Sequence, residues 1–497
     1  MSNILFAASE VFPLIKTGGL ADVAASLPRA LTRVGQNVRI ILPAYTPVMK
    51  AAADIELKKL KSFDVDGKLV TLWKTKLPET RVTVLLVDIP EFFERDGNPY
   101  CGPDGRDWPD NAQRFYWFAK VVRLVALNQA GLKWPVDIVH CNDWQTGLIP
   151  ALLSRDSARP KTVFTIHNLA YCGVFSHQEF LDLNLPDEFW HYESLEFHNQ
   201  ICFMKGGLVY ADHITSVSPT YTEEIQTPER GHGLDGLLRH RQEHLSGILN
   251  GIDVDEWNPA ADKNLAKTYN RRTLDKKQIN KKALQEQLGL VADPDVPLLG
   301  FIGRLVDQKG IELIITLLPL LIAKGYQIAV LGSGNRQYES SLTALAQQHP
   351  DQVSVTVGYN EALAHQIKAG IDIFLMPSLY EPCGLNQLYS LRYGTIPVVH
   401  AVGGLRDSVA DYSESEQGIT ANGFLFYSFT SEALLNAILR AARSYQDKTL
   451  WRKLQNNGMS LDLSWLHSAQ QYLDLYNDIL GLNDRSGEIP NIESALV

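Results

Sequence analysis

Cysteine is scarce in this sequence. Five cysteines occur among 497 residues, with no C-x-x-C pair and no metal-ligand spacing: Cys101, Cys141, Cys172, Cys202 and Cys383. This pattern excludes a disulfide framework and the common cysteine metal sites. A reducing compartment fits best, so we expect a cytoplasmic protein.

Long apolar runs are missing as well. The most apolar helix-like segment, 311–323, contains Glu312 and Pro319 and is shorter than the roughly 20 residues that cross a bilayer. The opening residues MSNILFAASEVFPLIK have no basic start before a strand-length apolar stretch, so we expect no signal peptide. The sequence therefore predicts no membrane partner.

Positive charge is in deficit. Acidic residues outnumber basic ones 56 to 46, which gives a formal net charge of -10. Nucleic-acid binding depends mainly on contacts of Lys and Arg with phosphates, so we expect no nucleic-acid partner. A small cationic pocket for one phosphorylated ligand remains compatible with this balance, and so does a neutral polymer.

Metal-binding patterns are limited to a loose D-x-D. It occurs three times, each time in a turn-like stretch, and is common by chance: Asp64 with Asp66, Asp253 with Asp255, and Asp293 with Asp295. We therefore expect no metal and no cofactor. Cations of the protein are the better candidates for binding a diphosphate.

Short apolar strands that alternate with helical patterns are abundant. The chain is too long for one hydrophobic core, and this alternation is typical of parallel sheets with crossover helices. Six strands are predicted in each half: 4–8, 38–42, 82–87, 137–140, 162–166 and 213–217, then 298–303, 327–331, 353–357, 371–376, 396–400 and 424–426. The predicted fold class is α/β, with two Rossmann-like doubly wound domains.

The stretch GILNGIDVDEWNP, residues 247–259, is rich in Gly, Asn and Pro and indicates a hinge. We place an N-terminal domain at 1–250 and a C-terminal domain at 251–462. A helix within 463–482 is expected to pack back toward the N-terminal domain. The remaining 483–497 is expected to form a loose tail.

Glycine pairs open two predicted helices after strands. Gly18 and Gly19 begin GGLADV, and Gly403 and Gly404 begin GGLRDSV. Glycine lets the backbone pass close to a ligand while free N–H groups of the helix start point outward. The alternative is a pair of tight turns. Their place at the carboxyl ends of strands, where open α/β sheets bind ligands, favours an anion or sugar site.

Charged side chains follow strand ends in the second half. Arg304 and Lys309 in FIGRLVDQKG stand between a strand and a helix, and Glu381 follows strand 371–376. Cations and a helix dipole at one point suit a diphosphate leaving group, whose negative charge grows as its bond to a sugar breaks. Glu381 would accept hydrogen bonds from sugar hydroxyls. The alternatives are solvated cations on a loop, a glutamate that complements the helix dipole, and for Cys383 a small buried hydrophobe.

Polar residues also follow strands in the first half. His167 and Asn168 come after strand 162–166, Asp143 follows the strand that ends at His140, and Lys16 adds a cation. Because these strand ends share one edge, their side chains would face the same crevice. A core histidine is the alternative for His167. The aromatic stretch 92–118 either lines a glucan path or packs in the core.

Six motifs, in their order, resemble those of bacterial glycogen synthases and plant starch synthases over nearly the whole chain: KTGGLADV, TIHNLAYCG, HITSVSPTY, LNGID, GRLVDQKG and YEPCGLNQLYSLRYGTIPVV. Each motif alone is weak, and the ordered set is specific. The resemblance implies the GT-B arrangement, two Rossmann-like domains facing across a cleft. It also implies retaining transfer of glucose from ADP-glucose to the non-reducing end of an α-1,4-glucan such as glycogen, without a metal.

The resemblance also implies roles for single residues. His167 would lie near the glucosyl carbon, Arg304 and Lys309 would hold the diphosphate, and Glu381 would hold the sugar hydroxyls. Further donor contacts would come from Lys16, Gly18, Gly19, Asp143, Asn168, Asn250, Tyr359, Cys383, Gly384 and Leu385.

The chain departs from the family pattern at a few positions. Asn142 and Gln145 stand where histidines are expected, and Asn386 stands where threonine is usual. Tyr389 stands where many other two-domain retaining transferases have a second glutamate. The loop TIHNLAYCG contains no carboxylate to act as a nucleophile, which favours attack from the leaving-group face.

Four other functions are alternatives to transfer of glucose from ADP-glucose. A related GT-B enzyme using UDP-glucose and a glucan-binding protein without catalysis are the alternatives, the second opposed by the intact set of site residues. A dinucleotide oxidoreductase lacks its G-x-G-x-x-G signature here. A sugar-nucleotide epimerase would also need cations, but the ordered motifs point elsewhere. The sequence does not indicate an oligomeric state.

Overall fold

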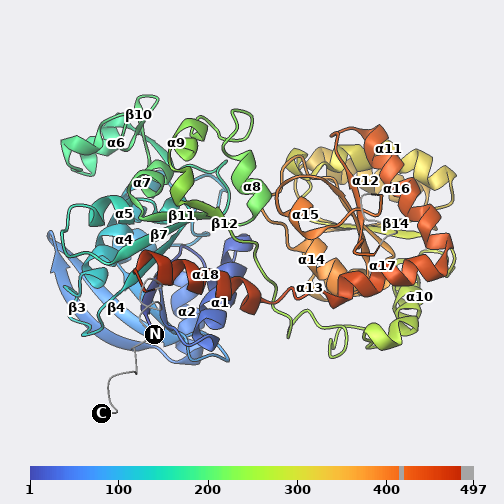
Figure 1. Ribbon diagram of the computed structural model, residues 1–497, viewed down its shortest axis with the longest axis horizontal. Coiled ribbons are helices and arrows are strands. Elements are labelled where there is room, and N and C mark those ends of the chain that lie inside the picture. The colour runs from blue at the N-terminus through green and yellow to red at the C-terminus, as the bar shows by residue number, and fades with distance from the viewer. Residues whose placement is uncertain (414–418, 483–497) are drawn as a thin grey trace, which may run out of the picture. The chain divides into compact units, whose positions relative to one another are not determined.

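The computed structural model describes residues 1–413 and 419–482. The predicted tail 483–497 lies outside these residues. The chain divides into two compact units, each with its own sheet (Figure 1). Unit 1 consists of Met1–Val217, Thr222–Asn250 and the segment from Trp465 onward, and unit 2 consists of Ser218–Tyr221 and Gly251–Ser464.

Unit 1 contains a nine-stranded sheet in the order β12-β11-β7-β6-β1-β2-β5-β4-β3. Seven strands are parallel: β1 Asn3–Ala7, β2 Asn37–Pro43, β5 Thr83–Asp88, β6 Ile138–Asn142, β7 Lys161–Ile166, β11 His213–Ser216 and β12 Leu245–Gly247. They include all six strands predicted for the first half. Apart from the half-buried edge strand β12, the parallel strands are largely buried, as strands covered on both faces must be.

An antiparallel hairpin at one edge of this sheet was not predicted. It consists of β3 Lys58–Val65 and β4 Lys68–Lys76, and β4 joins the hairpin to β5. Lysines interrupt β3, half of whose residues are exposed, and lysines flank the apolar residues of β4. A half-solvated edge hairpin of this kind differs from the buried parallel strands, so the pattern that identified those strands does not find it.

Helices cover the sheet of unit 1, and a small three-stranded sheet lies outside it. The helices are α1 Gly19–Arg33, α2 Thr46–Ile55, α3 Pro90–Phe93, α4 Asn111–Ala126, α5 Leu148–Leu153, α6 His177–Asp182, α7 Phe203–Tyr210, α9 Asp235–His240 and α18 Trp465–Ile479. The helix α8 Pro219–Glu224 is divided between the two units after Tyr221. The small sheet pairs β8 Val174–Ser176, β10 Gln200–Cys202 and β9 Glu196–Phe197. Phe92, Phe93, Phe115 and Phe118 are buried, so core packing accounts for much of the aromatic stretch.

The helix α18 belongs to unit 1, although the sequence between Gly251 and Ser464 belongs to unit 2. It packs beside α1 (Figure 1). The hydroxyl of Tyr476 in α18 lies 2.6 Å from Nδ1 of the buried His140 in β6. The end of the described chain is therefore tied into the core of the first sheet.

Unit 2 contains six parallel strands in the order β15-β14-β13-β16-β17-β18, and all six were predicted. The strands are β13 Leu298–Ile302, β14 Gln327–Gly332, β15 Val353–Val357, β16 Ile373–Met376, β17 Ile396–His400 and β18 Phe424–Phe426. The helices are α10 Lys277–Leu288, α11 Ile311–Ala323, α12 Arg336–Gln348, α13 Glu361–Gly370, α14 Asn386–Arg392, α15 Gly403–Ser408, α16 Ser431–Gln446 and α17 Lys448–Ser460. Residues of these strands and helices form two hydrophobic clusters. One includes Phe301 and Ile314, and the other includes Phe374 and Ile367.

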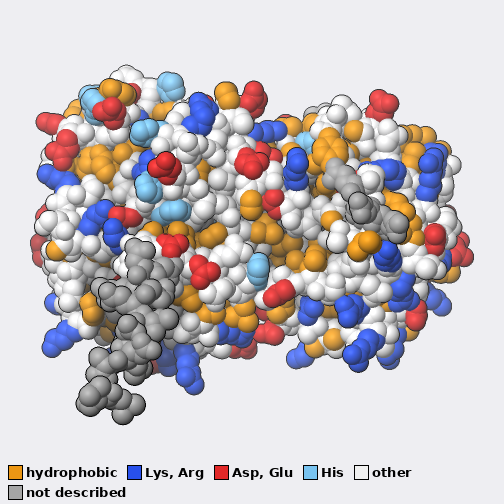
Figure 2. Space-filling model, in the orientation of Figure 1, with side chains coloured by type: hydrophobic (Ala, Val, Ile, Leu, Met, Phe, Trp, Pro, Cys, Tyr) orange, Lys and Arg blue, Asp and Glu red, His pale blue; other side chains and the backbone are white. Residues whose placement is uncertain are grey.

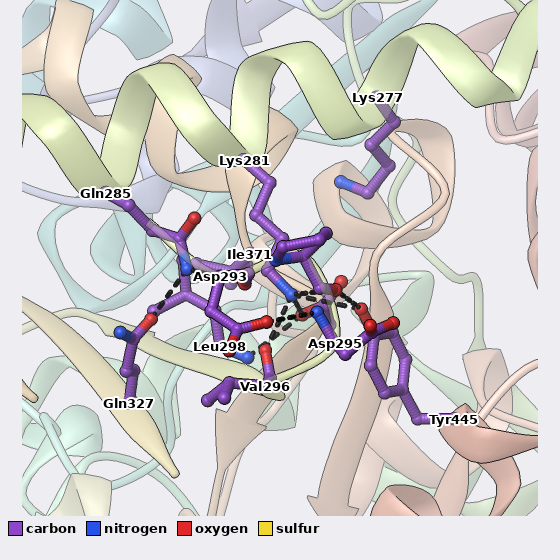
Figure 3. A network of polar contacts seen from close by, with 12 residues as sticks. Lys277, Lys281, Gln285, Asp293, Asp295, Val296, Leu298, Gln327, Ile371 and Tyr445 are labelled. Carbon is purple, nitrogen blue, oxygen red and sulfur yellow. Dashed lines mark hydrogen bonds and ion pairs between the residues drawn. The ribbon is translucent and has the colours of Figure 1, made fainter. Parts of the chain in front are cut away.

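A buried polar network fixes α10 to the start of this sheet (Figure 3). Lys281 and Gln285 point from α10 toward the segment before β13. The ammonium of Lys281 lies 2.7 Å from a carboxylate oxygen of Asp372 and donates to the carbonyl of Val296 at 2.6 Å and to the hydroxyl of Tyr445 at 3.0 Å. A buried ammonium is tolerated when it is paired and fully hydrogen-bonded. This network therefore fixes the position of α10 relative to the segment before β13.

Acidic and basic side chains are distributed differently over the surfaces of the two units. On the face drawn in Figure 2, acidic and basic side chains are interspersed over unit 1, while basic side chains gather near α10 in unit 2. Among residues 1–413 and 419–482, no helix has the length and apolar character needed to cross a membrane.

Candidate active site

In unit 2, a lysine and a glutamate meet beyond the carboxyl ends of β13 and β16. A short 3-10 turn, Asp307–Lys309, follows β13 and presents Lys309. Its ammonium lies 2.6 Å from Oε2 of Glu381, and the hydroxyl of Ser378 donates to the same oxygen at 2.9 Å. The structure therefore brings together two predicted site residues that are 72 positions apart.

Glycine is required at the end of the turn that carries Lys309. Gly310 has a φ of 66°, and a Cβ there would lie 2.0 Å from the carbonyl oxygen of Pro377. The backbone after β13 thus runs directly against the backbone after β16. This close approach brings Lys309 within reach of Glu381.

Arg304 lies at the same edge of the sheet and is exposed. Its guanidinium donates to Oε1 of Gln308 at 3.2 Å, and Gln308 donates to the carbonyl of Tyr380 at 3.3 Å. Arg304 is thereby tethered toward the loop that holds Glu381. The two predicted cations and the predicted carboxylate belong to one constellation within unit 2.

The second glycine pair holds the loop of Glu381. Gly403 has a φ of 43°, and a Cβ there would lie 2.1 Å from the carbonyl oxygen of Glu381. A Cβ on Gly404 would lie 2.2 Å from the carbonyl oxygen of Cys383. At GGLRDSV the close approach is therefore to the chain itself, which is a packing reason for glycine. By contrast, a Cβ on Gly18 or Gly19 meets nothing within 4 Å in the described chain.

Three further predicted residues continue this loop. Cys383 is buried, and its thiol donates to the carbonyl of Gly384 at 3.3 Å. Gly384 has a φ of 73°, and Leu385 precedes the first residue of α14. The side chain of Gln387 donates to the carbonyls of Cys383 and Gly384 at 3.1 and 3.0 Å. These bonds fix the backbone between Glu381 and α14.

In unit 1, Asp143 organises the loop that follows β7. Its Oδ1 accepts the backbone N–H of His167 at 2.8 Å and that of Asn168 at 3.3 Å. Asp143 has a φ of 57°, an uncommon conformation for a residue with a side chain, and these two bonds hold it. Burial raises the pKa of Asp143 to about 7, although the two backbone hydrogen bonds oppose the rise.

His167 is held at the same edge of the first sheet. Its Nε2 lies 2.9 Å from Oδ1 of Asn142, the last residue of β6. Burial lowers the pKa of His167 to about 3, so the ring is neutral near pH 7. The predicted trio of Asp143, His167 and Asn168 is therefore contiguous in unit 1.

The loop with Lys16 is organised by a residue that the sequence analysis missed. Glu10 is buried and accepts hydrogen bonds from the hydroxyl of Tyr100, from the backbone N–H and hydroxyl of Thr17, and from the N–H of Gly18 at 3.2 Å. Lys16 itself pairs with Asp22 at 2.8 Å. Glu10 follows β1 as Asp143 follows β6, so its place after a strand was the available signal.

Comparisons with known proteins agree along the whole chain. Residues 3–240 match the family model of the starch synthase catalytic domain, and residues 284–458 match that of glycosyl transferases group 1. A glycogen synthase of Cellvibrio japonicus is 63% identical over 479 residues, covering 96% of this chain and 100% of that one. The chain belongs to the glycogen synthase family. It is a glycosyltransferase with the two Rossmann-like domains of the GT-B class.

Three further proteins are similar to this chain over nearly its whole length. A glycogen synthase of Marinobacter nauticus is 53% identical, covering 98% of this chain and 100% of that one. Among solved structures, the catalytic domain of starch synthase IV from Arabidopsis thaliana, bound to ADP and acarbose, is 34% identical with a TM-score of 0.86, covering 97% and 99% of the two chains. A sucrose-phosphate synthase from Thermosynechococcus elongatus, 17% identical with a TM-score of 0.58 over 97% and 100% of the chains, shares the fold.

Tyr359 and Asn250 are the two remaining predicted site residues. Tyr359 follows β15 and is 76% exposed, as a ring available for stacking on a base would be. Asn250 lies at the division between the two units. It is buried, and its Oδ1 has no hydrogen-bond partner within the described residues.

The D-x-D pairs have structural explanations. In each pair the first aspartate accepts a nearby backbone N–H: Asp64 from Gly67 at 3.0 Å, Asp253 from Asp255 at 2.9 Å, and Asp293 from Asp295 at 2.8 Å. Asp64 lies at the end of strand β3, not in a turn as the sequence analysis placed it. Each of these hydrogen bonds stabilises a local chain reversal, because an aspartate side chain readily accepts a nearby backbone N–H.

One group of potential metal ligands does occur in the described chain, formed by Glu256, Glu361 and His365. Its histidine is already engaged, because Nδ1 lies 2.7 Å from Asp262 and Nε2 lies 3.6 Å from Glu361. Burial lowers the pKa of His365, but its bonds to Asp262 and Glu361 raise it to about 9. With its ring protonated, His365 forms ion pairs with Asp262 and Glu361 near pH 7.

The departures from the family pattern also have places in the structure. Tyr389 stacks on Trp257 with ring centroids 3.9 Å apart, which makes it a packing residue. Asn386 donates to the carbonyl of Ile302 at 3.1 Å and ties the Glu381 loop to the end of β13. Gln145 is buried, and its Oε1 has no partner within the described residues.

Proposed function

We propose that this protein transfers glucose from ADP-glucose to the non-reducing end of an α-1,4-glucan, with retention of the α configuration. The observation that carries the proposal is the pair formed by Lys309 and Glu381, 2.6 Å apart beyond the strand ends of unit 2. Relatives named glycogen synthase and the likeness to a starch synthase bound to ADP and acarbose support the donor and the acceptor.

The cations of unit 2 act on the leaving group. As the glycosidic bond breaks, negative charge develops on the diphosphate of ADP, and Lys309 and Arg304 stabilise it. Because both cations are already tethered, by Glu381 and Gln308, little reorganisation is needed at the moment of reaction. No metal is required in this proposal, since the protein supplies the positive charge.

Glu381 acts on the transferred sugar. Glu381 is buried, with a side chain that is 9% exposed, and its carboxylate accepts hydrogen bonds from Ser378 and Lys309. Carboxylate oxygens have further lone pairs that accept hydrogen bonds from sugar hydroxyls. The glycines at 403 and 404 let the loop lie flat against α15 and so fix the carboxylate in place.

Unit 1 supplies the uncharged imidazole of His167 to the sugar. Asp143 commits Oδ1 to two backbone N–H groups and so holds the loop of His167 and Asn168. His167 is uncharged near pH 7 and cannot serve as an acid there. The loop has no carboxylate nucleophile, so attack comes from the leaving-group face, and the departing phosphate takes the proton of the acceptor hydroxyl.

One experiment distinguishes the proposed function from a UDP-glucose-dependent transferase and from a non-catalytic glucan-binding protein. The purified protein is supplied with glycogen and either radiolabelled ADP-glucose or radiolabelled UDP-glucose, and the label in precipitated polymer is counted. The proposal predicts label from ADP-glucose in large excess over label from UDP-glucose. Preferential transfer from UDP-glucose would identify the related transferase, and glycogen binding without any transfer would identify a non-catalytic glucan-binding protein.

A further inference from the structure

The contacts of Asn142 determine which way its side-chain amide is turned. The side chain is fully buried. Its Nδ2 donates to the carbonyl of Ala7 at 3.0 Å and lies 3.4 Å from the carbonyl of His140. Backbone carbonyls accept hydrogen bonds and never donate them, so the amino group must occupy this side. The amide oxygen of Asn142 therefore faces the other way, toward His167.

This orientation determines where the proton sits on His167. The amide oxygen of Asn142 lies 2.9 Å from Nε2, and an amide oxygen accepts only. Nε2 therefore carries a hydrogen. A neutral imidazole has one N–H, so Nδ1 carries a lone pair and accepts hydrogen bonds. The backbone N–H of His167 donates a hydrogen bond to Oδ1 of Asp143, which fixes the main chain beside the imidazole ring.

We propose that Asn142 is a positioning residue that locks His167 in the Nε2–H tautomer, so that Nδ1 accepts a hydrogen bond from a hydroxyl of the transferred sugar. The tautomer follows from contacts within unit 1 alone. The sugar contact rests on the proposed function.

The tautomer matters because the sugar ring becomes positively charged in the transition state. Hydroxyls on that ring become stronger donors as the charge develops, so an acceptor stabilises the transition state more than the ground state. The opposite tautomer would direct an N–H toward those hydroxyls, and an imidazolium would place a positive charge beside the ring. Both would oppose the reaction.

The first test reads the tautomer directly. The full chain is labelled with 15N-histidine, and long-range 1H–15N correlation spectra assign the protonated nitrogen of His167, with His167→Gln to identify its signals. The wild type should show the Nε2–H form alone near pH 7. Asn142→Leu, which removes the acceptor, should show averaged signals from both tautomers. Asn142→Asp keeps an acceptor oxygen and should keep the proton on Nε2.

The second test separates positioning from folding. In Asn142→Leu, kcat with ADP-glucose and glycogen should fall about tenfold, the value of one hydrogen bond, while KM for the donor changes less than about twofold. The matched control is Gln36→Leu in the same unit. Gln36 is also a buried amide, and its oxygen accepts the N–H of Ser2 at 2.8 Å. It should leave both the tautomer and kcat unchanged.

Three results would overturn the proposal. They are an Nδ1–H tautomer in the wild type, a single Nε2–H tautomer that persists in Asn142→Leu, and an unchanged kcat in that variant. If Asn142→Leu does not fold, the spectra of the wild type and Asn142→Asp decide the tautomer. If the wild type transfers no glucose from ADP-glucose, the proposed function fails, and the spectra still decide whether Asn142 sets the tautomer.

Discussion

Lys309 and Glu381 form an ion pair of 2.6 Å in which the lysine side chain is 19% exposed and the glutamate side chain 9%. A pair this far from water is held in one geometry, because each charge would be poorly solvated without the other. The pair links the turn after β13 to the loop after β16. Both segments are candidates for contact with a sugar nucleotide.

Separating this pair should affect stability as well as activity. We expect Lys309→Met and Glu381→Gln each to lower the free energy of unfolding of unit 2 by about 1 to 2 kcal/mol, because each leaves a largely buried polar partner unpaired. The double variant should lose less than the sum of the two. Urea unfolding of the four proteins measures this coupling, and strictly additive losses would show that the two side chains do not interact.

The two glycine pairs should respond differently to a methyl group. Gly404→Ala places a Cβ 2.2 Å from the carbonyl oxygen of Cys383, so we expect a loss of about 1 to 3 kcal/mol in stability and a higher KM for ADP-glucose. Gly18→Ala meets nothing within 4 Å in the described chain. It should leave the melting temperature unchanged and lower kcat/KM by about tenfold, because the added methyl group displaces the donor. Normal kcat/KM in Gly18→Ala would remove Gly18 from the donor site.

The carboxyl group of Asp143 should make stability fall as pH rises. Burial raises its pKa from an unfolded value of 3.8 to about 7, so between these values the folded state binds more protons than the unfolded state. The stabilisation is fully present below about pH 4 and is lost as pH rises through about 7. Asp143→Asn should flatten this part of the profile, as measured by urea unfolding at pH 5 and pH 7.5. An equally steep profile in the variant would contradict the assignment.

Removal of divalent metals should leave the reaction intact. The charge at the leaving group comes from Arg304 and Lys309 in the proposed mechanism, so protein dialysed against EDTA should transfer glucose within about twofold of the untreated rate. Added Mg²⁺ should not restore activity to Lys309→Ala. A large loss on chelation that is reversed by Mg²⁺ would show that a metal shares the role of the lysine.

Much of the fold could be predicted from the sequence, because buried parallel strands leave a clear record. Each strand of unit 2 is a short apolar run bounded by turns, and all six were found. The β3–β4 hairpin was missed because lysines interrupt β3 and flank the apolar residues of β4. Strand ends also located Lys309, Glu381, Asp143 and His167, since polar residues there stand out against the apolar strands.

Other parts of the site depend on contacts that no local pattern records. The bond between Lys309 and Glu381 joins residues 72 positions apart, and the amide of Asn142 acquires its orientation from Ala7, 135 positions away. The glycine pairs look alike in sequence, yet only Gly403 and Gly404 pack against another loop in the described chain. The sequence indicates which residues belong to the candidate site, and the structure is needed to show which groups each of them contacts.

Lys309 is expected to stabilise the departing diphosphate, and a single-turnover measurement tests this role most directly. Radiolabelled ADP-glucose at saturating enzyme is mixed with glycogen, and the rate of label transfer is compared for the wild type, Lys309→Ala and the control Lys324→Ala, an exposed lysine that follows α11. We predict that Lys309→Ala slows transfer by at least about a hundredfold, about 3 kcal/mol, while the control matches the wild type. A near-normal rate in Lys309→Ala would contradict the account.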